Sequence, residues 1–217
     1  DFRFFHWHLR FGEVMEKAGF DCVLGNPPWD RIKLYEKEFF SARCPLIASA
    51  KTTAEREELI EALRLTDKDL FHDYQVKLRE VDAAIEWIRS KVRFPLSSSG
   101  ELNTYTVFIE NALRVARHDG RSGLVVPTGF ATDKSSNKLF LECIRTSSLI
   151  SLNDFENRAG LFEDVHRSYR FSLVTLGRIN SEPIFSFFLI TSQPTKCAWS
   201  ILALHHVRHL DPYTTRI

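Results

Sequence analysis

The tetrapeptide Asn26-Pro27-Pro28-Trp29 has residue types that could do chemistry, and it directly follows the short apolar run Phe20–Gly25. We predict that this run is a buried strand, because it is apolar and stops abruptly at Gly-Asn-Pro-Pro. Open α/β sheets bind their ligands at the carboxyl ends of parallel strands. The sequence therefore predicts a ligand site at residues 26–29.

This corner suits a planar ring that carries an exocyclic amino group. Two successive prolines fix the backbone and remove two N–H donors, so the turn presents carbonyl oxygens without competing donors. Asn26 adds an amide oxygen, and Trp29 adds a flat face on which a ring can stack. The alternative is a rigid turn in which Trp29 only packs; the strand before the motif favours the ligand site.

The elements that position this corner begin with a helical insertion over residues 34–99. Thr52-x-x-Glu55 predicts a capping box at the start of one helix. The next helix carries an apolar stripe at steps of three and four, which we interpret as a packing face. The stripe consists of Leu70, Tyr74, Leu78, Val81, Ile85 and Ile88.

After the insertion the chain alternates between helix and strand. An amphipathic helix over residues 105–116 is expected to stop at Asp119-Gly120, and a second buried strand is expected at Gly123–Pro127. The predicted fold class is α/β: the second half of a doubly wound sheet, with a helical insertion and an antiparallel tail. The remaining elements are a helix marked by Leu139, Phe140, Cys143 and Ile144, and strands at about 149–155, 170–176 and 184–190.

Composition narrows the class of protein. The 217 residues carry a net charge of +1, which neither supports nor excludes nucleic acid. No apolar run approaches the roughly 18 residues of a membrane span. The cysteines form no CxxC pair, so a cytoplasmic protein without disulfides or zinc is expected. His6-Trp7-His8 and His205-His206-x-x-His209 have no accompanying Cys, Asp or Glu cluster, so no metal is expected.

Several motifs, in a fixed order, resemble one family. Phe20–Trp29 resembles the catalytic motif of class I amino-methyltransferases, in the version found in adenine-specific (N6) DNA methyltransferases of type IIG restriction–modification and phage-defence systems. The other motifs run through almost the whole chain. They are His6-Trp7, Phe11-x-Glu13-Val14, Gly100–Tyr105, Gly120–Gly129, Phe155–Arg158, Leu161-Phe162 and Arg170–Leu173.

The resemblance implies transfer of a methyl group from S-adenosylmethionine to adenine N6 in double-stranded DNA. Asn26 and Pro27 would accept the two N6 hydrogens, and the adenine would be flipped out of the duplex and stacked on Trp29. Phe162 is the first candidate for the opposite wall and Phe171 the second, although core packing explains either. Residues 180–217 would start the connection to a recognition domain. Basic residues that could meet phosphates, unless they are only solvated charges, are Lys134, Lys138, Arg158, Arg167 and Arg170.

One departure from the family concerns the cofactor. The family holds S-adenosylmethionine with a Gly-rich loop after the first strand, but no G-x-G occurs in this chain, and Gly120 and Gly123 precede a strand instead of following one. We therefore expect the earlier strands to lie before Asp1, within a larger protein. The isolated chain is then expected to be inactive, and its first strand would be an exposed edge that favours self-association.

Three alternatives remain open at this point. The chain could belong to a methyltransferase that acts on a protein glutamine or on guanine in RNA. It could be a non-enzymatic remnant that binds DNA or a partner through the insertion helices, or a structural fragment without a function. Trp29 and the long insertion favour DNA.

Overall fold

A computed structural model describes residues 5–157, 166–178 and 182–188. The described residues form one five-stranded mixed sheet. Its strands are β1 (Phe20–Gly25), β2 (Ala116–Pro127), β3 (Leu149–Glu156), β4 (Arg170–Leu176) and β5 (Ile184–Phe188). Their order in the sheet is β1-β2-β4-β3-β5. β1 runs parallel to β2, and β5 runs parallel to β3, whereas β4 runs antiparallel to both of its neighbours.

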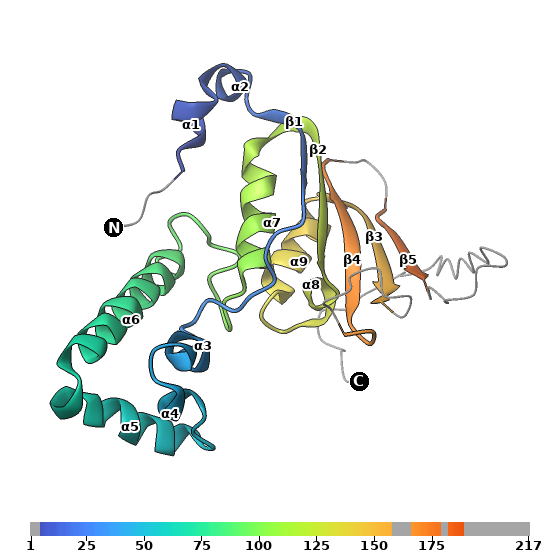
Figure 1. Ribbon diagram of the computed structural model, residues 1–217. Coiled ribbons are helices and arrows are strands. Elements are labelled where there is room, and N and C mark those ends of the chain that lie inside the picture. Colours follow the sequence, from blue (N-terminus) through green and yellow to red (C-terminus); the bar gives the residue numbers. More distant parts are fainter. Residues whose placement is uncertain (1–4, 158–165, 179–181, 189–217) are drawn as a thin grey trace.

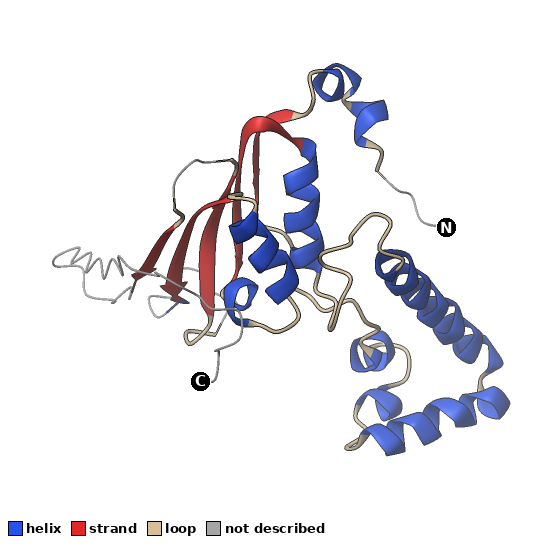
Figure 2. Ribbon diagram, turned by 180° about the vertical axis from the view of Figure 1, so that it is seen from behind, coloured by secondary structure: helices blue, strands red, loops and turns tan. Residues whose placement is uncertain are grey.

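Among the described elements, helices cover one face of this sheet (Figures 1 and 2). They are α7 (Thr104–Val115), α8 (Gly129–Thr132) and α9 (Asn137–Arg145). Between these helices and the sheet lies the main core, in which Ile109, Val126 and Leu139 are completely buried. The α/β fold class with a helical insertion is therefore confirmed, and the antiparallel part of the sheet is β4.

β1 lies at an edge of the sheet, as expected, with β2 as its partner in the described chain. The prediction that β1 is buried is wrong. Val23 packs against the core, but Leu24 is 79% exposed on the opposite face. A strand is buried on both sides only when helices cover both faces of its sheet, and here the described helices cover one.

The helix after the insertion ends earlier than the sequence predicts. α7 stops at Val115, and the chain passes directly into β2. Asp119-Gly120 lies in the irregular start of β2, where Phe20 pairs with Ala116 but Cys22 pairs with Arg121. A Cβ atom at Gly120 would lie 2.7 Å from the Phe20 carbonyl oxygen, so glycine is needed here for close strand approach.

The insertion forms an arm that stands apart from the sheet in Figure 1. Its core is aromatic and aliphatic, and Phe40 is completely buried within it. Glu36 ties the arm together, since its carboxylate accepts hydrogen bonds from Arg56 Nε and Tyr74 Oη, both at 2.9 Å. Burial, and then this bond to Glu36, raise the pKa of Tyr74 to about 12. The helices of the arm are α3 (Glu36–Ser41), α4 (Pro45–Ala48), α5 (Thr53–Thr66) and α6 (Lys68–Arg89).

The expected start of α5 is present in a modified form. The Thr52 hydroxyl accepts from the Glu55 N–H at 3.1 Å, while the Glu55 carboxylate accepts from Lys51 N–H at 2.8 Å, one residue before the position of an ideal capping box. In the apolar stripe of α6, the packing interpretation is confirmed for the residues that contact a core. These are Leu70, Tyr74 and Leu78 in the arm core, and Ile85 and Ile88 beside Phe94 and Leu102.

Two short helices, α1 (Trp7–Arg10) and α2 (Gly12–Glu16), precede β1. Their aromatic rings meet those of β1: Trp7 and Phe11 each contact Phe20 edge-on, at 5.5 and 5.4 Å between ring centroids. No described helix is long and apolar enough to cross a membrane. β5 places residues 184–188 in the sheet, while residues 189–217 lie outside the described chain, so the expected division into domains stays a prediction.

Candidate target-base corner

The Asn26–Trp29 corner lies where β1 ends, at the same end of the sheet as the carboxyl end of β2. Asn26 and Pro28 are exposed, Pro27 is buried, and Trp29 is half-buried. The polar residue of the motif is therefore accessible at the end of β1, while the first proline anchors the turn in the body of the domain.

Trp29 is held at one fixed place beside the sheet. Its Nε1 donates to the carbonyl oxygen of Val125 in β2 at 3.2 Å, and its ring packs against the main core. Tyr169 lies parallel to it, with 6.0 Å between the ring centroids and 14° between the planes. The two rings thus form a parallel aromatic pair at the edge of the sheet.

Tyr169 is a residue that the sequence reasoning missed. It immediately precedes β4 and is 47% exposed. Because β4 runs antiparallel to β2 and pairs Phe171 with Pro127, the start of β4 lies beside the carboxyl ends of β1 and β2. The available signal was an aromatic residue between two arginines directly before a predicted strand.

The two phenylalanines expected to face the base have different outcomes. Phe162 lies outside the described residues. Phe171 lies in β4, is 5% exposed, and stacks on Phe155 of β3 at 5.4 Å. Among the described residues, Tyr169 is a ring that lies next to Trp29, and the role expected for Phe162 and Phe171 stays a prediction.

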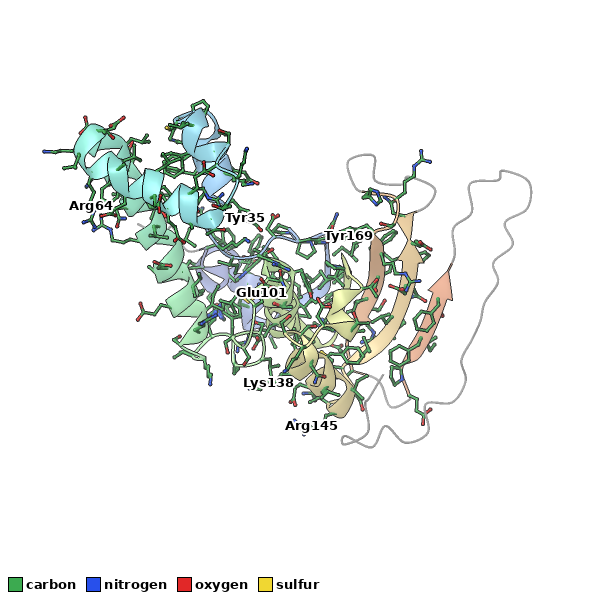
Figure 3. All side chains as sticks on the ribbon, turned by 90° about the horizontal axis from the view of Figure 1, so that it is seen from below. Tyr35, Arg64, Glu101, Lys138, Arg145 and Tyr169 are labelled. Atoms are coloured by element: carbon green, nitrogen blue, oxygen red, sulfur yellow. The ribbon has the colours of Figure 1, made fainter. Side chains whose placement is uncertain are left out.

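The expected basic residues have different surroundings. Arg167 and Arg170 are exposed and flank Tyr169 in the chain. Lys134 is exposed in the segment between α8 and α9, and Lys138 Nζ donates to the Pro95 carbonyl at 3.0 Å. Figure 3, which looks at the sheet from below, shows Lys138 well separated from Tyr169. Arg158 lies outside the described residues.

A buried carboxylate ties together the strand ends behind the corner. Asp154 of β3 is 5% exposed and accepts hydrogen bonds from the hydroxyls of Thr128, directly after β2, and of Ser172 in β4, the latter at 2.8 Å. Buried polar groups need such partners, since an unpaired carboxylate costs much more to bury. The network therefore fixes the ends of three neighbouring strands relative to one another.

Tyr105, in the first turn of α7, is an ionisable residue whose side chain is buried in the main core. Burial raises its pKa to about 12, and the negative charge of Asp133 acts in the same direction. Its hydroxyl therefore stays neutral at any physiological pH, and it supplies no proton acceptor for the chemistry.

The described glycines do not form the glycine-rich loop that holds S-adenosylmethionine. The described glycines with positive φ are Gly19, Gly100 and Gly177, and each packs against other atoms of this chain. None of these three glycines lies in a loop directly after β1. The described part of the chain therefore lacks the glycine-rich loop of an S-adenosylmethionine site. Within residues 5–157, 166–178 and 182–188, no three His, Cys, Asp or Glu side chains gather as metal ligands.

Comparison with known proteins gives one family match. Residues 1–63 match the model of the Eco57I restriction-modification methylase family. This range includes the whole Asn26–Trp29 corner and the first helices of the arm. The comparison with curated proteins gave no match.

Among solved structures, the chain is similar to a type I restriction-modification methyltransferase subunit from Streptococcus thermophilus, with 12% identity, a TM-score of 0.44, and coverage of 80% of this chain and 27% of that one. It is also similar to a modification subunit of a putative type I restriction enzyme from Vibrio vulnificus, with 15% identity, a TM-score of 0.42, and coverage of 85% and 28%. The chain thus spans less than a third of the length of either protein. The match of residues 1–63 confirms the resemblance to restriction–modification DNA methyltransferases that the motifs predicted.

Proposed function

We propose that the complete protein transfers a methyl group from S-adenosylmethionine to the N6 atom of adenine in DNA, in a restriction–modification or phage-defence system. In this proposal the present chain carries the target-base pocket. The observation that carries the proposal is the Asn26–Trp29 corner at the end of β1, with Trp29 pinned to Val125 and parallel to Tyr169.

The acceptor amine needs help because the N6 lone pair of adenine is delocalised into the ring. Asn26 Oδ1 and the Pro27 carbonyl accept its two hydrogens, which localises the lone pair and fixes its direction. These contacts strengthen as positive charge develops on N6, so orientation and electrostatics together lower the barrier. S-adenosylmethionine carries an electrophilic methyl group, and the residues of the remaining protein hold it.

A base within a duplex cannot reach this corner, so the adenine is flipped out of the helix. Trp29 then stacks on one face of the base, and each such stack contributes roughly 1–3 kcal/mol. We propose Tyr169 as the second wall. The two rings now lie nearly parallel, with 6.0 Å between their centroids, and an outward movement of the exposed Tyr169 would make room for the base.

Double-stranded DNA is the proposed partner, and the exposed charges next to Tyr169 are the ones best placed to meet its backbone. Arg167 and Arg170 lie on either side of that ring in the chain. A phosphate contact at these positions would hold the strand while the base turns inward, without reading its sequence. The phosphate contacts of Lys134, Lys138 and Arg158 remain weaker proposals, because Lys138 lies apart from Tyr169 and Arg158 lies outside the described residues.

The experiment that tests the function identifies the methylated product. The complete protein is incubated with unmethylated DNA of mixed sequence and labelled S-adenosylmethionine, and the DNA is digested to nucleosides. We expect the label in N6-methyladenine. Label in a cytosine or guanine nucleoside, in RNA or in a protein glutamine would replace this proposal with another methyltransferase activity.

We predict that residues 1–217 alone do not bind S-adenosylmethionine at micromolar concentration, because the sequence contains no G-x-G loop. Isothermal titration calorimetry of the isolated chain measures this directly, with the complete protein as the positive control. The isolated chain should likewise transfer no methyl group. Saturable micromolar binding by residues 1–217 would show that the cofactor site is built from other residues.

We also propose that the isolated chain associates with itself through the edge of β1 that has no partner strand among the described residues. An unpaired edge strand offers its N–H and C=O groups to another chain, and Leu24 adds an apolar side chain that is 79% exposed. Light scattering should detect association, and Leu24→Lys should reduce it. Leu46→Lys is the control, because Leu46 is 65% exposed but lies on the arm. A wild-type chain that remains monomeric at high concentration would contradict this proposal.

A further inference from the structure

The segment that leads into α7 runs beside the residues that follow Trp29. Arg31 and Asn103 form an isolated antiparallel bridge, and the Ile32 N–H donates to the Leu102 carbonyl at 2.9 Å. Arg31 and Glu101 form an ion pair at 2.9 Å across the same two segments. The corner is therefore bonded to the start of α7, although the whole insertion separates the two segments in the sequence.

Thr104 forms side-chain hydrogen bonds with the turn that carries the proposed catalytic atoms. Its hydroxyl donates to the Pro28 carbonyl at 2.6 Å and accepts from the Asp30 N–H at 3.2 Å. Its own N–H donates to the Asp30 carbonyl at 2.9 Å. One threonine thus bonds to the residues before and after Trp29.

The chemistry of the turn makes this contact important. Pro27 and Pro28 have no N–H groups, so they cannot donate the backbone hydrogen bonds that hold other turns. The Pro28 carbonyl lies one peptide beyond the Pro27 carbonyl, which is the proposed acceptor of an N6 hydrogen. A donor that fixes the Pro28 carbonyl therefore also limits rotation of the peptide that carries the Pro27 carbonyl.

Thr104 is itself firmly placed. It is the first residue of α7, and the residues that follow it lie in the main core, where Tyr105 is 2% exposed and Ile109 is completely buried. We call the hydrogen bond from Thr104 to the Pro28 carbonyl the clamp. It can position the turn only if Thr104, its base, is held more rigidly than the turn. Here the base is a buried helix, and the held part is an exposed turn.

We infer that Thr104 is a positioning residue for methyl transfer: its hydroxyl holds the Pro28 carbonyl so that Asn26 and Pro27 face the acceptor amine. This inference rests on the proposed function. The bond from Thr104 to Pro28 has a different role from the bond between Trp29 and Val125, because the latter fixes the stacking ring and not the two acceptors.

The test compares Thr104→Val, which removes the hydroxyl but keeps the shape, with Thr104→Ser, which keeps the hydroxyl. In the complete protein, Thr104→Val should lower the single-turnover rate of methyl transfer about tenfold, because one hydrogen bond that orients the reacting groups is lost. The affinities for DNA and S-adenosylmethionine and the melting temperature should change little. Thr104→Ser should keep most of the rate.

Thr106→Val is the matched control. Thr106 lies in the same helix, and its hydroxyl donates to the Asn103 carbonyl at 2.8 Å, a local bond that does not reach the corner. A rate loss in Thr104→Val but not in Thr106→Val supports the clamp. Equal losses in both variants would overturn it, since they would reflect a weakened helix start.

Two further outcomes separate the clamp from the proposed function. If Asn26→Ala abolishes transfer while Thr104→Val keeps the wild-type rate, Thr104 has no positioning role although the corner is correct. If Asn26→Ala keeps the wild-type rate, the proposed function fails and the clamp fails with it. Should Thr104→Val not fold, Thr104→Ala and Thr104→Ser give the same comparison, and equal rates in these two variants would overturn the inference.

Discussion

Asn26→Ala should lower the rate of methyl transfer by the complete protein by about 10²–10³, because losing one preorganised polar contact at a reacting centre typically has this effect. The substitution removes one of the two proposed acceptors of the N6 hydrogens. It leaves both prolines and the bond from Trp29 to Val125 to shape the corner. DNA affinity should change little, since most of it comes from phosphate contacts made elsewhere. The measurement is transfer of labelled methyl groups to DNA beside a binding assay.

Variants of Trp29 provide the comparison for Asn26. Trp29→Ala should weaken capture of the flipped base, whereas Trp29→Phe should retain part of the activity, because a phenyl ring still stacks. Asn26→Ala should therefore act on the rate at saturating DNA, and Trp29→Ala on the concentration of DNA that is needed. If Asn26→Ala methylates at the wild-type rate, Asn26 is not an acceptor in this reaction.

Phe40→Ala should destabilise the arm by about 3–5 kcal/mol, the usual cost of removing a buried phenylalanine ring. Phe40 is completely buried and contacts Phe39 at 4.9 Å and Tyr74 at 5.4 Å between ring centroids. The arm has a core of its own, separate from the core under the sheet. Hydrogen exchange should therefore show loss of protection in α5 and α6 but not in β2 or α7.

Leu46→Ala is the matched control for Phe40, since Leu46 lies in the same arm but is 65% exposed. It should change stability by no more than about 0.5 kcal/mol. If Phe40→Ala removes protection from β2 and α7 to the same extent as from α5, the arm and the sheet unfold as one unit. The arm core would then not be a separate unit of stability.

Local patterns in the sequence predicted the parts of the fold that depend on near neighbours. The strand predicted over residues 170–176 matches β4 at both ends, and Thr52 caps α5 as expected. The strand before Asn26 is also present, because Gly25 and the prolines after it end the strand through backbone chemistry alone. These features depend on a few consecutive residues, which a single sequence displays directly.

Features that depend on distant parts of the chain were missed. The exposure of Leu24 follows from which faces of the sheet are covered, and the irregular start of β2 at Gly120 follows from the close approach of Phe20. Tyr169 comes beside Trp29 only because β4 pairs antiparallel with β2. Neither the order of strands nor their register is written in the residues next to Tyr169, so the second ring of the aromatic pair could not be identified from the sequence.

The most direct test of the proposed target-base corner is an experimental structure of the complete protein with its DNA substrate and a non-reactive cofactor analogue. We predict an adenine turned out of the duplex and stacked between Trp29 and Tyr169. Its N6 atom should lie within about 2.7–3.2 Å of both Asn26 Oδ1 and the Pro27 carbonyl oxygen. A target base that remains stacked in the duplex, or one whose amino group points away from Asn26 and Pro27, would contradict the proposed target-base corner.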